Sequence, residues 1–220
     1  MTRIRLAARL LRSLVPPVIC FTLAWPLDLG QAQPLELDSD VRVWIEGGQA
    51  VATSPLSGRR EIPLDVQEVV VGSGAKGINA IVVTSRRLLG FSSRTLGWSG
   101  IARDVREKIV ERRMMPTFSL VRTDTHIYGF RGANGIWFEE ALGVRERVER
   151  MHSNDYGAVA VTNERLVGFG PLLGAFSSQA LGLHEHITTV TNENGLILVT
   201  TSHRTLVFGS RMIGWDEFEQ

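Results

Sequence analysis

From residue 41 onward, short apolar segments alternate with polar turns, and the whole pattern recurs with a 39-residue period. Five series of positions share this interval: Phe91, Phe130, Phe169 and Phe208; Thr84, Thr123, Thr162 and Thr201; Trp98, Trp137, Phe176 and Trp215; Glu68, Glu107, Glu146 and Glu185; Val66, Val105, Val144 and Leu183. A fainter copy begins at Val41, which falls one 39-residue period before Ala80. The chain therefore contains five copies of one unit, which indicates a repeat architecture.

Each copy divides into four short segments. The first is apolar and β-branched, as in Ala80 to Thr84, and such a run is typical of a strand covered on both faces. A two-residue polar turn leads to the second segment, Leu88 to Phe91, and the third is built around the Trp98 position. The fourth, such as Glu107 to Arg113, is more polar. We therefore expect four strands, with the apolar strand innermost and the polar strand outermost.

Two of the polar segments, Ile101 to Met115 and Ala141 to Met151, would be read as amphipathic helices if taken alone. Their equivalents in other copies, Val66 to Val71 and His186 to Val190, are β-branched and disfavour helix. Because copies of one repeat should share one structure, we predict strands at all of these positions.

Four strands in about 40 residues are the proportions of a β-propeller blade. The sequence thus predicts an all-β fold, a five-bladed propeller of 39-residue repeats over residues 33–220. We expect blades near residues 41–79, 80–118, 119–157, 158–196 and 197–220. The last blade would be completed by residues 34–38, an N-terminal strand around Leu35 to Leu37 that closes the ring.

Residues 34–220 resemble β-propellers made of short repeats, and the five-bladed tachylectin-type propellers are nearest in blade number. The resemblance is architectural, because no lectin-family signature is present. The Gly-His and Trp-Asp dipeptides of WD40 propellers do not recur either, since Trp215-Asp216 occurs once. The resemblance therefore implies a fold and no particular ligand.

Residues 1–32 have the organisation of a secretory signal peptide. Four arginines, at positions 3, 5, 9 and 12, precede the apolar stretch Leu14 to Trp25 and a small-residue site at Gly30 to Ala32. The stretch is shorter than the roughly 20 residues that span a bilayer. We predict a cleaved signal and an exported protein, periplasmic or secreted, with no stable membrane insertion after cleavage. The alternative is an uncleaved anchor.

Cysteine use and charge exclude several functions. The single cysteine, Cys20, lies in the signal-like segment behind Ile19, which does not fit a lipoprotein signal. A mature chain would have no thiol for disulfides, zinc-thiolate sites or nucleophilic catalysis. Residues 33–220 contain 20 basic and 22 acidic side chains, whereas a nucleic-acid binder needs a basic face. We therefore expect no nucleic-acid partner.

Enzyme motifs are missing from the sequence. It has no Gly-x-Ser-x-Gly elbow, phosphate-binding glycine loop or His-Glu-x-x-His pair, so we expect a non-enzymatic protein without a cofactor. His184 and His186 fall on a predicted strand, where alternate side chains share a face. They occur in one copy without a third ligand, so no metal site is predicted.

Positions that repeat in every copy are expected to be scaffold. The Phe91 series and the glycines before it, such as Gly90, should pack one blade on the next. The Trp98 series either fills the wedge between blades, the interpretation we favour, or stacks on sugar rings. The Glu68 series, with Arg87 and its equivalents, forms either structural ion pairs or ligand contacts, and structural pairs are favoured.

The loops that differ most between copies are the best place for a ligand-binding face. They are residues 72–78, 113–117, 152–157 and 192–195, together with 92–95, 131–134 and 171–173. The candidate ligand-binding residues are Trp98, Trp137, Trp215, Arg94, Arg131 and Asn134. We predict a binding or interaction module for an unknown protein or glycan. The alternatives are a lectin with repeated sites and a glycoside-processing enzyme with paired carboxylates.

Overall fold

The computed structural model describes residues 40–173, 175–209 and 214–219. The predicted signal peptide at 1–32 and the predicted closing strand at 34–38 lie outside these residues. The described part of the chain is all-β, as predicted, and contains nineteen strands. No helix in this part is long and apolar enough to cross a bilayer.

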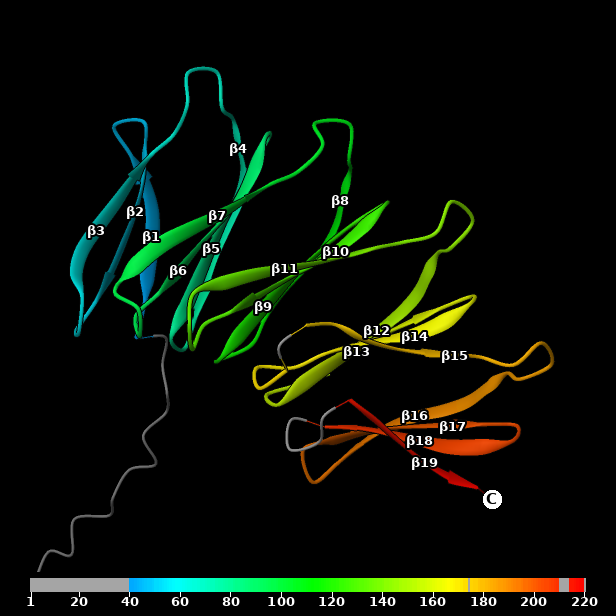
Figure 1. Ribbon diagram of the computed structural model, residues 1–220. Coiled ribbons are helices and arrows are strands. Elements are labelled where there is room, and N and C mark those ends of the chain that lie inside the picture. Colours follow the sequence, from blue (N-terminus) through cyan, green and yellow to red (C-terminus); the bar gives the residue numbers. More distant parts are fainter. Residues whose placement is uncertain (1–39, 174, 210–213, 220) are drawn as a thin grey trace, which may run out of the picture. The chain divides into compact units, whose positions relative to one another are not determined.

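The strands form five antiparallel sheets that follow one another along the chain (Figure 1). The first sheet is β1 (Arg42–Glu46), β2 (Gln49–Ser54) and β3 (Gly58–Pro63). The second is β4 (Val70–Lys76), β5 (Asn79–Thr84), β6 (Arg87–Ser92) and β7 (Gly97–Ala102). The third is β8 (Ile109–Met114), β9 (Phe118–Thr123), β10 (His126–Arg131) and β11 (Ile136–Ala141).

The last two sheets repeat this plan. The fourth is β12 (Val148–Asn154), β13 (Gly157–Thr162), β14 (Arg165–Phe169) and β15 (Ser177–Ala180). The fifth is β16 (Ile187–Glu193), β17 (Leu196–Thr201), β18 (Arg204–Gly209) and β19 (Trp215–Glu219). The polar segments with a helical pattern contain β8 and the start of β12 and no helix, so the prediction of strands is confirmed for their second halves, while residues 103–108 and 142–147 are loops.

The grouping of strands into sheets differs from the predicted blades. We expected residues 80–118 to form one blade, with the polar segment outermost. Instead, the polar strand β8 pairs with β9 of the next copy, and residues 70–102 form the sheet. The apolar strands β5, β9, β13 and β17 therefore lie second in each sheet, beside a polar edge strand, and are not at its inner edge.

This grouping also corrects the strand count at the two ends. The last sheet already has four strands, β16 to β19, and needs none from the N-terminus. Among the described residues it is the first sheet that has three. The prediction that residues 34–38 complete the last blade therefore started from a wrong count.

Neighbouring sheets interlock through the phenylalanine and glycine series, as predicted. A Cβ added at Gly90 would lie 2.5 Å from the Phe130 ring, and one added at Gly129 would lie 2.6 Å from the Phe169 ring. Gly168 has the same relation to Phe208. These phenylalanines are fully buried. The missing Cβ in one sheet thus provides the space that the aromatic ring of the next sheet fills.

Candidate functional site

Two edges of the stacked sheets present the connecting segments. We call one the repeated edge: the loops between sheets, 64–69, 103–108, 142–147 and 181–186, with the turns 47–48, 85–86, 124–125, 163–164 and 202–203. We call the other the variable edge: the turns 55–57, 77–78, 93–96, 115–117, 132–135, 155–156, 170–173 and 194–195. The variable edge contains most of the loops that differ between copies.

Hydrogen bonds join the turns of the variable edge. The Ser93 amide donates to the Ile78 carbonyl at 2.9 Å, and the Ile78 amide donates to Pro116 at 2.9 Å in the next sheet. The Gly132 amide then donates to the Thr117 carbonyl at 2.9 Å. These bonds bring turns 77–78, 93–96, 115–117 and 132–135 together on one edge.

A buried amide, which the sequence analysis did not single out, fixes this edge further. Asn79 Nδ2 donates to the carbonyls of Met115 (3.0 Å) and Pro116 (3.1 Å), and its Oδ1 accepts from the Ser119 hydroxyl. Asn79 is fully buried at the start of β5. Because a buried amide is costly without partners, these bonds hold two neighbouring sheets in one relative position.

Arg131 and Asn134, two of the predicted ligand-binding residues, form a hydrogen bond with each other. Arg131 Nε donates to Asn134 Oδ1 at 2.9 Å, and its Nη1 donates to the Leu173 carbonyl at 2.8 Å in the next sheet. The guanidinium also lies 5.1 Å from the centre of the Phe138 ring. Arg131 and Asn134 thus brace the variable edge, whereas the Arg94 side chain is exposed on turn 93–96.

The tryptophan series packs between sheets. Trp98, Trp137 and Trp215 are half-buried, with ring centres 5.4, 5.0 and 5.0 Å from Phe91, Phe130 and Phe208. Trp98 Nε1 donates to the Arg60 carbonyl and Trp215 Nε1 to the Ser177 carbonyl, both in the preceding sheet. These contacts support wedge packing, and sugar stacking at this series stays a prediction.

Exposed apolar side chains on the variable edge were missed by the sequence analysis. Leu56, Leu96, Tyr156 and Leu172 all lie in its turns and are exposed. They occupy positions that do not correspond between copies. The available signal was a large apolar residue inside a turn, where polar residues are usual.

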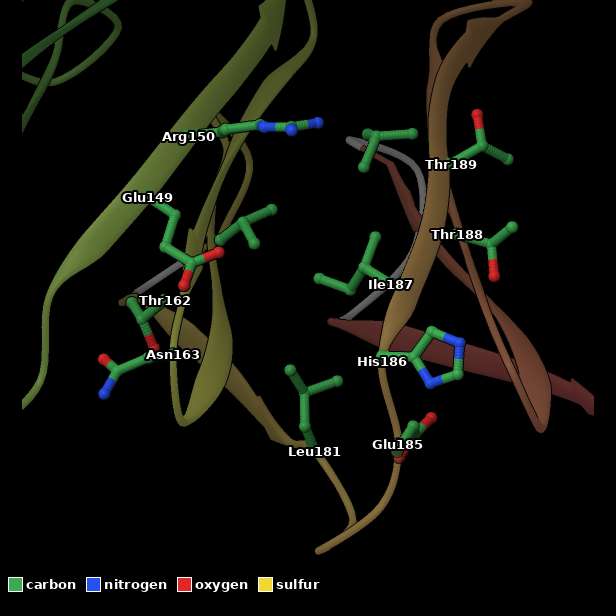
Figure 2. Close-up of a pocket in the computed structure, with 12 residues that line it drawn as sticks. Glu149, Arg150, Thr162, Asn163, Leu181, Glu185, His186, Ile187, Thr188 and Thr189 are labelled. Carbon is green, nitrogen blue, oxygen red and sulfur yellow. The ribbon is translucent and has the colours of Figure 1, made fainter.

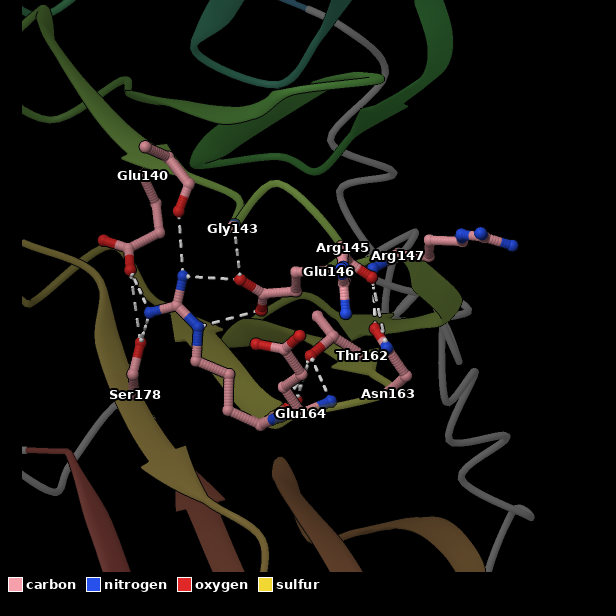
Figure 3. Close-up of polar contacts among 11 residues, drawn as sticks. Glu140, Gly143, Arg145, Glu146, Arg147, Thr162, Asn163, Glu164 and Ser178 are labelled. Atoms are coloured by element: carbon pink, nitrogen blue, oxygen red, sulfur yellow. Dashed lines mark hydrogen bonds and ion pairs between the residues drawn. The ribbon is translucent and has the colours of Figure 1, made fainter.

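On the repeated edge, the predicted glutamate and arginine series forms buried ion pairs. Arg165 binds both carboxylate oxygens of Glu146, at 2.8 and 3.2 Å, and Glu140 lies on its other side (Figure 3). The same guanidinium donates to Ser178 and to the Ala141 carbonyl at the end of the preceding sheet. The pair therefore ties one sheet to the next, and the structural interpretation is supported.

The same arrangement recurs in two other copies and changes in one. Arg87 binds Glu68 and the Pro63 carbonyl, while Arg204 binds Glu185 and the Ala180 carbonyl. In the third sheet His126 stands in place of arginine. Its Nδ1 lies 2.8 Å from Glu107, which also accepts the Tyr128 hydroxyl at 3.1 Å. Burial, and then the Glu107 charge, raises the pKa of Tyr128.

The paired glutamates have lowered pKa values. Burial alone would raise the pKa of Glu68, but hydrogen bonds from Arg87, Thr84 and the Asp65 amide lower it to about 2. Hydrogen bonding by Arg204 outweighs burial and lowers the pKa of Glu185 to about 2. Burial also raises the pKa of Glu146, but hydrogen bonding by Arg165 lowers it below its usual range. All three are therefore held as carboxylates.

These shifts predict an acid-sensitive fold. A carboxyl whose pKa is lower in the folded than in the unfolded chain stabilises the fold above its ordinary pKa of 4.5. That stability is lost as the pH falls toward the folded value of about 2. We expect a flat melting temperature from about pH 7 to 5 and a steep fall below about 4.5.

Calorimetry on wild type and Glu185→Gln measures this. The variant should melt below wild type at neutral pH, and the two curves should converge near pH 2, where Glu185 becomes protonated in both states. A difference that stays constant with pH would contradict the assignment.

A separate groove of about 300 Å³ lies between the last two sheets. Arg150 of β12 and Ile187 of β16 point into it, while Thr188 and Thr189 point away (Figure 2). His186 follows the turn before β16, so the expectation that His184 and His186 lie on a strand is wrong. Among the described residues, no three His, Cys, Asp or Glu side chains form a group that could hold a metal ion.

Comparison with known proteins gives distant structural likenesses. No protein-family model and no curated protein matches this chain. BamB from Moraxella catarrhalis is 8% identical, with a TM-score of 0.34 over 81% of this chain and 63% of that one. PorZ from Porphyromonas gingivalis is 11% identical, with a TM-score of 0.39 over 83% of this chain and 27% of that one. Against the first solved structures, this chain spans between 54% and 62% of their length.

Proposed function

We propose that this chain is an exported, non-enzymatic interaction module, and that its five sheets are the blades of one β-propeller. The 39-residue repeat supports the propeller, as does the phenylalanine-to-glycine packing that recurs at three junctions. Export is supported by the signal-like sequence of residues 1–32. We propose the periplasm or the medium as its location.

The observation that carries the interaction proposal is the set of exposed apolar side chains on the variable edge. Leu56, Leu96, Tyr156 and Leu172 project from turns of the variable edge, and Arg131 of the third sheet binds the Leu173 carbonyl in the turn that presents Leu172. Apolar groups exposed on a braced scaffold are typical of a surface that contacts another macromolecule. The partner would be a protein or a glycan.

The test is affinity capture from periplasm or culture medium with three immobilised forms of the mature protein. These are wild type, a variable-edge variant (Leu96→Ser, Tyr156→Ser, Leu172→Ser), and a control with equally exposed changes on the repeated edge (Val105→Ser, Val144→Ser). We expect a partner on wild type and control that the variable-edge variant loses, with all three melting within about 2 °C of each other. Equal capture by all three would overturn the use of this edge.

A further inference from the structure

The repeated edge carries one series that contradicts the expectation that repeated positions pack inside. The apolar side chains of Val66, Val105, Val144 and Leu183 recur with the same 39-residue period, yet they are between 69% and 106% exposed. An isolated exposed aliphatic residue needs no explanation. Four at one equivalent position, each of them Val or Leu, indicate a surface with a common use.

All four side chains stand at the second position of a four-residue turn. The turn is closed by an amide that donates to the carbonyl three residues earlier, from Glu68 to Asp65, Glu107 to Asp104, Glu146 to Gly143 and Glu185 to Gly182. The apolar residue is the second residue of each turn and is exposed, while the glutamate is the fourth and turns inward to an arginine or, for Glu107, to His126. The first turn differs in backbone at its third residue, Gln67, with φ of 65°, and in all four the apolar residue keeps the same outward position.

A ladder of backbone hydrogen bonds makes these loops into one row. Each loop accepts a bond from the neighbouring strand-to-strand turn: Ser85 to Val69, Asp124 to Lys108, Asn163 to Arg147 and Ser202 to His186. Each of the first three of these turns then accepts one from the next loop: Arg103 to Arg86, Leu142 to Thr125 and Leu181 to Glu164. The loops that present the apolar side chains are therefore held in one row, with a strand-to-strand turn between each loop and the next.

Basic side chains accompany the apolar ones in three consecutive loops. Val105 is followed by Arg106 and Lys108, Val144 by Arg145 and Arg147, and Leu183 by His184 and His186. All six basic side chains are exposed, and the glutamate between each pair is directed inward. The exposed acidic groups of this edge are Asp65, Asp104, Asp124 and Glu164, and two of them accept backbone amides, Asp104 from Arg106 and Asp124 from Lys108.

We propose that the repeated edge binds the surface of an anionic phospholipid bilayer. The four aliphatic side chains enter the headgroup layer, and the basic side chains beside them contact lipid phosphates. The protein then lies on the membrane and does not span it. A protein partner would favour a continuous patch with aromatic anchors, whereas here small aliphatic groups sit on four separate loops.

Vesicle co-sedimentation of the mature protein tests this surface. The probes are vesicles of phosphatidylcholine alone and vesicles with about 30% phosphatidylglycerol, at low and high salt. Wild type should bind the anionic vesicles at low salt and bind much less to the neutral ones. The change Val105→Ser with Val144→Ser and Leu183→Ser should weaken binding by about tenfold or more at unchanged melting temperature.

Matched variants separate the two contributions. Arg106→Gln with Arg145→Gln should weaken binding to anionic vesicles by about tenfold and reduce its salt dependence. Leu56→Ser with Leu172→Ser, on the variable edge, should bind like wild type. The proposal is overturned if wild type does not sediment with anionic vesicles, or if the variable-edge control loses binding as fully as the repeated-edge variant. A soluble partner captured only by an intact repeated edge, without vesicle binding, would also overturn it in favour of a protein ligand.

Discussion

Phe130→Ala is expected to lower the free energy of unfolding by about 3 to 5 kcal/mol. The ring is fully buried, fills the space at Gly90 in the preceding sheet and contacts Trp137 on its own sheet. Alanine would leave a cavity that a backbone braced on both sides cannot collapse into. Urea unfolding followed by tryptophan fluorescence measures the loss.

The matched change is Trp137→Phe, because Phe176 already occupies the equivalent position in the fourth sheet. Trp137 Nε1 is buried without a hydrogen-bond partner among the described residues. Replacing the indole with a phenyl ring therefore breaks no hydrogen bond within that part of the chain. We expect a cost below about 1.5 kcal/mol. If Phe130→Ala cost no more than this variant, the rings would not determine how the sheets pack.

Arg165→Met should destabilise the protein by about 3 to 5 kcal/mol, because it leaves the buried Glu146 carboxylate without its cation. The Glu146 side chain is only 3% exposed, and Arg165 also binds the Ala141 carbonyl of the preceding sheet. The double variant with Glu146→Gln should be less destabilised than Arg165→Met, since no unpaired charge stays buried.

The control for this prediction is Arg59→Met. Arg59 pairs with Glu46, but these side chains are 51% and 56% exposed, so its loss should destabilise the protein far less than the loss of Arg165. Equal losses at Arg59 and Arg165 would mean that burial does not decide the strength of these pairs. Chemical unfolding at neutral pH compares the three variants with wild type.

The sequence predicted the strands, the repeat and the packing series, because each depends on local pattern or on identity at a fixed interval. It did not predict the sheet boundaries, since a 39-residue period is the same wherever the unit is cut. The residues of the turns determine which strands pair, and therefore where each sheet begins. Asn194 and Gly195, with φ of 51° and 83°, form a two-residue hairpin connection that places β16 and β17 in one sheet.

The candidate binding surfaces were less accessible from sequence. Arg131 and Asn134 had the composition of ligand contacts, but each satisfies the other, and a residue's partner cannot be read from its type. The exposed Val66 series had the periodicity of a core position. Only the geometry of its turn sends the glutamate inward and the aliphatic side chain outward. Periodicity shows that copies are equivalent and leaves open whether the equivalent side chain faces protein or solvent.

Because rings pack on glycines, the two faces of a sheet are not interchangeable at the junctions from the second to the fifth sheet. Each of them has a glycine on the earlier sheet and a phenylalanine on the later one, so an internal 39-residue unit duplicated in tandem would find matching neighbours on both sides. The terminal sheets differ. Ala52 stands where the later copies have phenylalanine, and Val207 stands where the second, third and fourth copies have glycine. A 39-residue unit copied inside the series would therefore keep the ring-on-glycine contact, whereas a unit placed beside Ala52 or Val207 would lack it.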